Sequence, residues 1–237
     1  MLRSAMRWAA MGLMIVTAGA ASWAAEPDYA FGGGGPSIGT FMVEIDGINA
    51  FVVGAGFAPF NGDLLLLGGG GRGGVAPGVT FGGAGWGAWS ESHVGDLHAE
   101  FGVGLGGFDL GLGIGGSDRA VLAVGVLLGG GAAELVLTED APIPINGVLP
   151  RGIVVEPERE AYDSVFILVA PYVDVQIQIL EWAGFAVRAG YAWTPLELNF
   201  RDDGPLNPPR LSPSGFYVRV SIAFGAITPL GVARPSL

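Results

Sequence analysis

Apolar residues alternate with small or polar residues along most of the chain, and this two-residue period constrains the fold more than any other feature. The clearest run covers 163–180, where one face is wholly apolar and the other becomes polar in its second half. A strand places successive side chains on opposite faces, whereas a helix would mix the two sets. The apolar face carries Val165, Ile167, Val169, Pro171, Val173, Val175, Ile177 and Ile179, and the polar face carries Tyr172, Asp174, Gln176 and Gln178.

The same alternation predicts an all-β chain of about eight strands. Short turns and longer polar connections alternate along the chain, which in an up-and-down arrangement places them at opposite ends, and an even number of strands places both termini at the end with the short turns. This layout favours a single up-and-down antiparallel β-barrel over 37–224, after a glycine-rich lead at 25–36 and before a tail at 225–237. The predicted strands are 37–45, 63–72, 78–90, 96–114, 119–138, 163–180, 184–194 and 215–224, and the predicted long connections are 46–62, 91–95, 139–162 and 195–214.

Residues 1–24 have the pattern of a secretory signal peptide. Arg3 and Arg7 precede an apolar run at 8–20, and small residues stand at Ser22 and Ala24, where signal peptidase selects for them. The run is shorter than the roughly 18 residues that a membrane-spanning helix needs. Later apolar segments are interrupted by glycine, proline or charge before they reach about 20 residues. We therefore expect an exported protein that could cross a membrane only as strands.

Composition narrows the classes of partner and site. The chain has no cysteine, which excludes disulfides and thiolate metal sites. Its formal net charge is −11, so we expect no nucleic-acid partner, because such binding needs a basic surface. Half of the residues are hydrophobic and 14% are charged, which is too apolar for a disordered chain and unusual for a soluble secreted domain.

In layout the chain resembles the small outer-membrane β-barrel proteins of bacteria. The resemblance is most specific in the last third, where strand, short turn, strand, long loop and a final strand ending at Phe224 follow one another. It implies an outer-membrane barrel surrounded by lipid, with a non-enzymatic role in the cell envelope that is structural or carried by its loops. The tail after Phe224 departs from the pattern of these proteins, which usually end at such an aromatic residue.

Two features favour a different arrangement. The segment 47–60 could form a short amphipathic helix, and the strands at 63–72 and 119–128 are apolar or glycine on both faces, as in strands buried on both sides. A soluble β-sandwich, or a sheet covered by the helix at 47–60, is the alternative fold. Such a protein would be secreted or held at the cell surface, and unpaired strand edges would favour its self-association.

The 43 glycines need a physical reason, because each one in a strand interior costs about 0.5–1 kcal/mol relative to alanine. In a barrel of eight strands, inward glycines would relieve crowding and leave space for an internal network of charged residues. The alternatives are close approach of a second sheet or helix, and bulges or bends at 32–35, 68–71 and 129–131. The candidates for the network are Glu100, Asp109, Glu134, Arg188 and Arg219.

No motif predicts a catalytic, cofactor-binding or metal site. The segments 102–107 and 111–116 match GxGxxG but open no helix, and 68–74 lacks the lysine and hydroxyl residue of a P-loop. His93 and His98 are five residues apart, which on one strand places them on opposite faces and is wrong for joint metal ligation. We therefore expect no enzymatic activity.

Aromatic residues near the predicted strand ends suit the two interfacial girdles of a membrane barrel, with ordinary core packing as the alternative. They are Trp86, Trp89, Tyr172, Tyr191, Trp193, Phe216, Tyr217 and Phe224.

Overall fold

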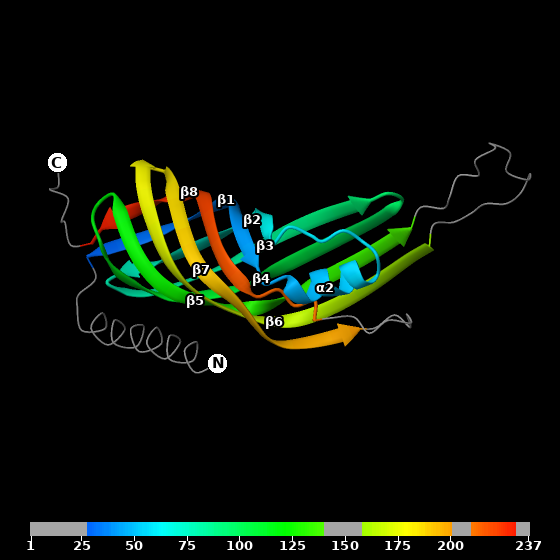
Figure 1. The fold of residues 1–237 in the computed structure, drawn as a ribbon. Coiled ribbons are helices and arrows are strands. Elements are labelled where there is room, and N and C mark those ends of the chain that lie inside the picture. Colours follow the sequence, from blue (N-terminus) through cyan, green and yellow to red (C-terminus); the bar gives the residue numbers. More distant parts are fainter. Residues whose placement is uncertain (1–27, 140–157, 201–209, 231–237) are drawn as a thin grey trace, which may run out of the picture.

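A computed structural model describes residues 28–139, 158–200 and 210–230, which form a closed antiparallel barrel (Figure 1). Each strand pairs with its neighbours in sequence, and the last strand closes the ring on the first. The predicted all-β up-and-down barrel of eight strands is confirmed, and the alternative sandwich is not formed. The elements are β1 (Tyr29–Val43), α2 (Asp46–Gly54), β2 (Asp63–Ala76), β3 (Gly78–Val94), β4 (Leu97–Gly116), β5 (Ala120–Glu139), β6 (Glu158–Leu180), β7 (Ala183–Phe200) and β8 (Gly215–Pro229).

The barrel begins earlier and ends later than the sequence predicts. β1 starts at Tyr29, so most of 25–36 is strand rather than a lead, and β8 continues past Phe224 to Pro229. The glycine run in β1 is held as strand because it pairs with β2 on one side and β8 on the other. The expected signal peptide, 1–24, and the end of the expected tail, 231–237, lie outside the described residues.

The connection predicted as a long loop at 91–95 is instead a tight turn. β3 continues to Val94 and β4 begins at Leu97, so that only two residues join them. Gly95 has a φ of 59°, a left-handed conformation that glycine adopts without steric cost. The polar residues at 91–93 have the composition of a loop, but they form the end of β3.

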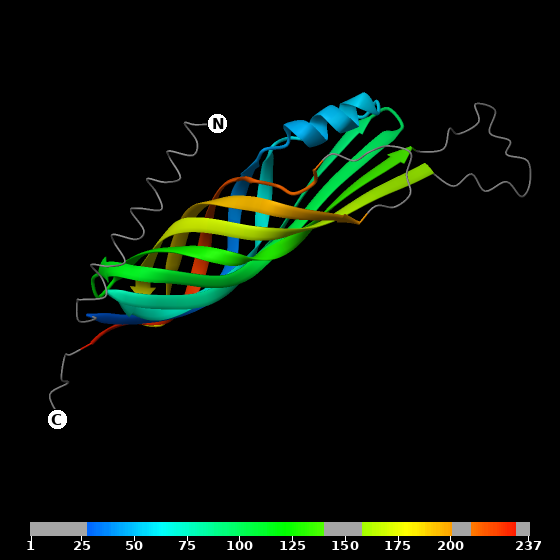
Figure 2. The same cartoon turned by 90° about the horizontal axis from the view of Figure 1, so that it is seen from below.

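The two ends of the barrel differ in their connections and in how far the individual strands extend. The connections after β2, β4 and β6 are all short and lie at one end, here called the short-turn end. The connections after β1, β3, β5 and β7 lie at the other end, here called the long-loop end, and among them only the β3–β4 turn is short. At the long-loop end, β3 to β6 and part of β7 extend beyond β1, β2 and β8 (Figures 1 and 2). Strand pairing shows the same difference. β3 pairs with β2 only over Leu67–Gly74 of β2, and β7 pairs with β8 only as far as Ala192, so both longer strands continue beyond their shorter neighbours.

Helix α2 lies in the mouth of the barrel, against the inner face of the taller wall (Figure 2). Its residues Ile48 and Val52 are buried, and the Phe51 ring meets the Tyr162 ring of β6 edge-on, with centroids 5.5 Å apart. The predicted helix near 47–60 therefore exists, but it covers a barrel mouth instead of a sheet face. Among the described residues, no helix has the length and apolar character needed to cross a membrane.

Side-chain and backbone hydrogen bonds fix the two segments in the mouth. The Asn49 amide accepts from the Phe60 N–H at 2.8 Å and donates to the Phe60 carbonyl at 3.1 Å, which anchors the chain after α2. Before β8, Leu211 is buried, and the Glu197 carboxylate accepts from the Leu211 N–H and the Ser212 hydroxyl, both at 2.8 Å. The mouth is thus filled by two chain segments as well as by strand side chains.

Inward glycines allow close approach of strands and rings, as the sequence predicts. A Cβ on Gly107 would collide with the backbone of β5. A Cβ on Gly125 would collide with the Tyr172 ring, which lies directly opposite on β6. A Cβ on Gly190 would likewise collide with the Tyr217 ring, which lies directly opposite on β8. The alternative of bulges at 32–35, 68–71 and 129–131 is wrong, since the register there is continuous. The register shifts instead near Gly113, Ile167 and Gln178.

Candidate functional site

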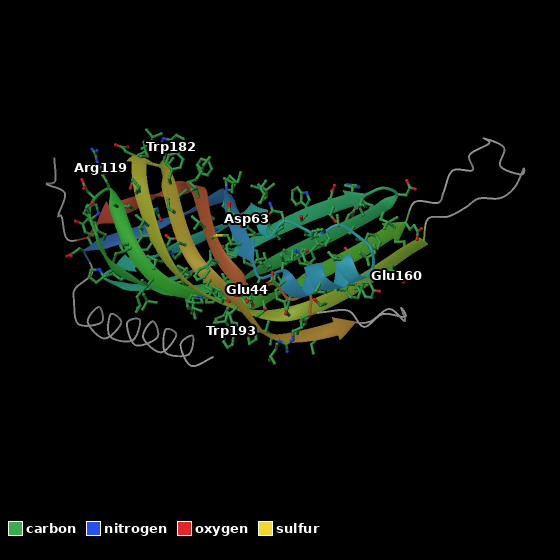
Figure 3. The ribbon with its side chains drawn as sticks, viewed as in Figure 1. Glu44, Asp63, Arg119, Glu160, Trp182 and Trp193 are labelled. Carbon is green, nitrogen blue, oxygen red and sulfur yellow. The ribbon has the colours of Figure 1, made fainter. Side chains whose placement is uncertain are left out.

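The outer surface of the barrel is apolar through the middle of its strands. On β6 every outward residue from Val165 to Ile179 is apolar, and the Val173 side chain is 49% exposed. Figure 3 shows Arg119 near the short-turn end and Glu160 toward the long-loop end. Among the described residues, the charged side chains that point outward from the strands all lie toward the long-loop end: Asp63, Glu91, Glu100, Glu134, Arg159 and Asp163.

Only some of the aromatic residues predicted for the interfacial girdles lie on the outer surface of the barrel. Trp89, Trp193, Phe216 and Phe224 are more than half exposed on the outside, and Tyr191 packs edge-on against Phe216. Figure 3 shows Trp193 and Trp182 on the outer surface. Closeness to a strand end does not decide which face a residue occupies, and three predicted members are buried in the lumen: Trp86, Tyr172 and Tyr217.

The lumen is filled in three layers. The layer nearest the long-loop end, here called the apolar core, is the largest, and α2 contributes Val52 to it. Charged residues occupy the middle layer. A smaller apolar group of Phe31, Ala76, Val121 and Ile227 lies nearest the short-turn end. The apolar core includes Phe41, Leu64, Phe101, Leu135, Leu168 and Leu211.

The middle layer, here called the ion cluster, consists of Arg72, Asp109, Tyr172, Asp174, Arg188 and Arg219. Arg188 is its centre, since its Nε lies 2.8 Å from Asp174 Oδ2 and its Nη1 lies 2.5 Å from Asp109 Oδ2. Arg72 donates to the other oxygen of Asp174, and the Tyr172 hydroxyl donates to Asp109. The Arg188 guanidinium also stacks on the Tyr172 ring, 3.7 Å from its centroid. Each carboxylate therefore receives two donors, as buried charges require.

Sequence reasoning identified half of this cluster. Asp109, Arg188 and Arg219 point into the lumen as predicted, but Glu100 and Glu134 point outward and are exposed. Both glutamates lie an odd number of residues from the inward positions of their strands, which places them on the opposite face. The three missed members are Arg72, which stands among glycines, Asp174, which lies on the polar face of 163–180, and Tyr172, which the sequence analysis assigns to an interfacial girdle.

His93 and His98 face each other, contrary to the prediction. The tight turn places them on neighbouring strands, where they are direct cross-strand partners with ring centroids 4.0 Å apart. His98 Nε2 lies 2.6 Å from Glu100 Oε1. Within the described segments, no group of three or more His, Asp or Glu side chains is arranged to hold a metal ion. The glycine motifs at 68–74, 102–107 and 111–116 all lie within strands.

Comparison with known proteins adds little to these observations. No protein-family model matches the chain, and no curated protein matches it. Among solved structures it is similar to Ail, the attachment invasion locus protein of Yersinia pestis, with 9% identity and a TM-score of 0.33 over 86% of this chain and 100% of that one. At that level of similarity no site or activity can be transferred, and the fold rests on the strand pairing described above.

Proposed function

We propose that the protein is an integral outer-membrane β-barrel without enzymatic activity, which serves the cell envelope structurally or through contacts at its long-loop end. The observation that carries this proposal is the apolar outer surface in the middle of the strands, with outward charges kept toward one end. In water such a surface would exceed the apolar patches that soluble monomers expose. In a bilayer it matches the hydrocarbon around it.

The closed ring of strands also supports a location in a lipid bilayer. Hydrocarbon offers no hydrogen-bonding partner to a free strand edge, so membrane sheets close on themselves. The apolar outward run of β6, from Val165 to Ile179, is longer than the roughly 9–11 residues that a tilted strand needs to cross a bilayer. Because side chains fill the lumen, as expected of eight strands, a structural or contact role is favoured over a wide pore.

Fractionation of cells that express the full chain tests the proposed location. We expect the protein in the outer-membrane fraction, with extraction by detergent and retention during washes in salt or alkaline buffer. Release into buffer without detergent would instead support the soluble, surface-associated alternative.

A pair of charge variants on one strand tests whether lipid surrounds the barrel. Val173 and Asp163 both point outward from β6, Val173 within the apolar run and Asp163 beyond its end. Val173→Arg should lower the free energy of unfolding by about 2–4 kcal/mol near the bilayer midplane, whereas Asp163→Arg should change it by about 0–1 kcal/mol. Urea unfolding in lipid vesicles measures both. If the two variants behave alike, Val173 is surrounded by water and the membrane assignment is wrong.

A further inference from the structure

Arg219 is a buried cation of the ion cluster without a carboxylate partner among the described residues. Its side chain is 5% exposed, and its Nε has no hydrogen-bond partner. The two carboxylates of the cluster are engaged by Arg72, Arg188 and the Tyr172 hydroxyl. With three arginines and two aspartates, the cluster carries one more positive than negative charge.

The position of Arg219 increases the cost of this charge. In the pairing of β7 with β8 it stands directly opposite Arg188, and like charges in such a pair destabilise a sheet. Its guanidinium is held over the Trp86 ring, 4.6 Å from the centroid, which fixes its place without neutralising it. A buried charge with no partner is unfavourable unless some other group compensates it.

A small cavity adjoins the guanidinium. Its volume is about 30 Å³, and the polar groups that line it besides the charged residues include the Gln176 amide and the Ser221 hydroxyl, both able to donate a hydrogen bond. Glycine and alanine form much of the remaining wall, so no bulky side chain fills the space. A polar cavity of this size can hold a single water or small ion.

We propose that this cavity binds one small monovalent anion of the size of chloride, held by Arg219 with Gln176 and Ser221 as further donors. One negative charge matches the excess charge of the cluster. Asp109 and Asp174 also line the cavity, but both already accept from two donors. The inference concerns the lumen and goes beyond the proposed membrane role, since it applies equally to the barrel in vesicles or in detergent.

The test uses the full chain folded in detergent micelles, with chloride replaced by gluconate at constant ionic strength. Gluconate is too large for the cavity, so the midpoint of thermal unfolding should rise with chloride concentration and remain constant in gluconate. Arg219→Gln should abolish this rise, while Arg119→Gln, in an exposed turn at the short-turn end, should retain it. Equal midpoints of the unmodified protein in the two salts would overturn the proposal.

Crystals grown in bromide give a second measurement that does not depend on whether Arg219→Gln folds. We expect an anomalous peak beside the Arg219 guanidinium of the unmodified protein. A cavity that holds water alone, with no anomalous signal at a bromide concentration that labels other surfaces, would contradict the anion site.

Discussion

The apolar core and the ion cluster fill the same ring of strands in different ways. On β6 the inward residues change from Phe166, Leu168 and Ala170 to Asp174 and Gln176, while the outward residues from Val165 to Ile179 are all apolar. The apolar core is stabilised by burial, which is roughly proportional to area and non-directional. The ion cluster depends on particular pairs, because each buried charge needs its partner. The apolar core should thus tolerate apolar substitutions that conserve volume, whereas the ion cluster should not tolerate changes of charge even when volume is conserved.

The largest loss is expected from the ion cluster. Asp174→Ala leaves both Arg72 and Arg188 without one carboxylate, and breaking a buried pair in this way costs about 3–5 kcal/mol. Asp174→Asn keeps the volume and should still lose most of that amount. Urea unfolding in micelles measures both, with the exposed Asp163→Ala as the control. A loss below about 1 kcal/mol, the range of exposed ion pairs, would show that water, not pairing, stabilises these charges.

The apolar core provides the matching test. Leu135 is fully buried, and Leu135→Ala should lower the free energy of unfolding by about 2–5 kcal/mol through lost burial and a residual cavity. Leu135→Met keeps the volume and should cost less than about 1.5 kcal/mol. A smaller loss for Leu135→Met than for Asp174→Asn would distinguish the apolar core from the ion cluster. Equal losses of unfolding free energy in these two variants would contradict that distinction.

Tyr172 lies where the two layers meet, and its place depends on glycine. A Cβ on Gly125 would collide with the Tyr172 ring, so Gly125→Ala should cost about 1–3 kcal/mol by overpacking. Gly104 faces outward, and a Cβ added there would meet no other atom within 4 Å, so Gly104→Ala should be neutral or stabilising by about 0.5–1 kcal/mol. Unfolding midpoints of the two alanine variants decide whether inward glycine is required there.

The smallest effect is expected at the mouth. Asn49→Ala removes both hydrogen bonds to Phe60 and should cost about 1 kcal/mol, because this site is only partly buried. Asn61→Ala removes an exposed bond to Asp63 and serves as the control. Protease sensitivity of the segment after α2 should rise in the first variant alone. Equal sensitivity would mean that apolar contacts of α2 suffice to hold the segment.

The outside of the barrel could be predicted from the sequence better than its inside. The outward row on β6 follows from alternation within one strand, so it needs no knowledge of neighbouring strands. The pairing of Arg72 with Asp174 joins residues about 100 apart, and only the register of the ring brings them together. The same limit explains the error at His93 and His98, because a tight turn between them reverses the chain.

The start of β1 was predicted wrongly because of its glycines. The run at 32–35 has the composition of a loop, yet it forms strand because both neighbouring strands supply hydrogen bonds to it. Local propensity in strands is weak compared with pairing of this kind. Placement of α2 could not be predicted either, since an amphipathic pattern shows that one face is buried without showing against what.

Because β3 to β6 extend beyond β1, β2 and β8, the long-loop end has a low side and a high side. A molecule that reaches this end over the shorter strands β1, β2 and β8 meets α2 and the segment around Leu211. On the opposite side, the outer face of the taller wall carries the outward carboxylates Glu91, Glu100 and Glu134. Exposed carboxylates stand on both sides, with Glu44 and Asp63 on the side of the shorter strands, so approach from the two sides differs in shape more than in the sign of charge.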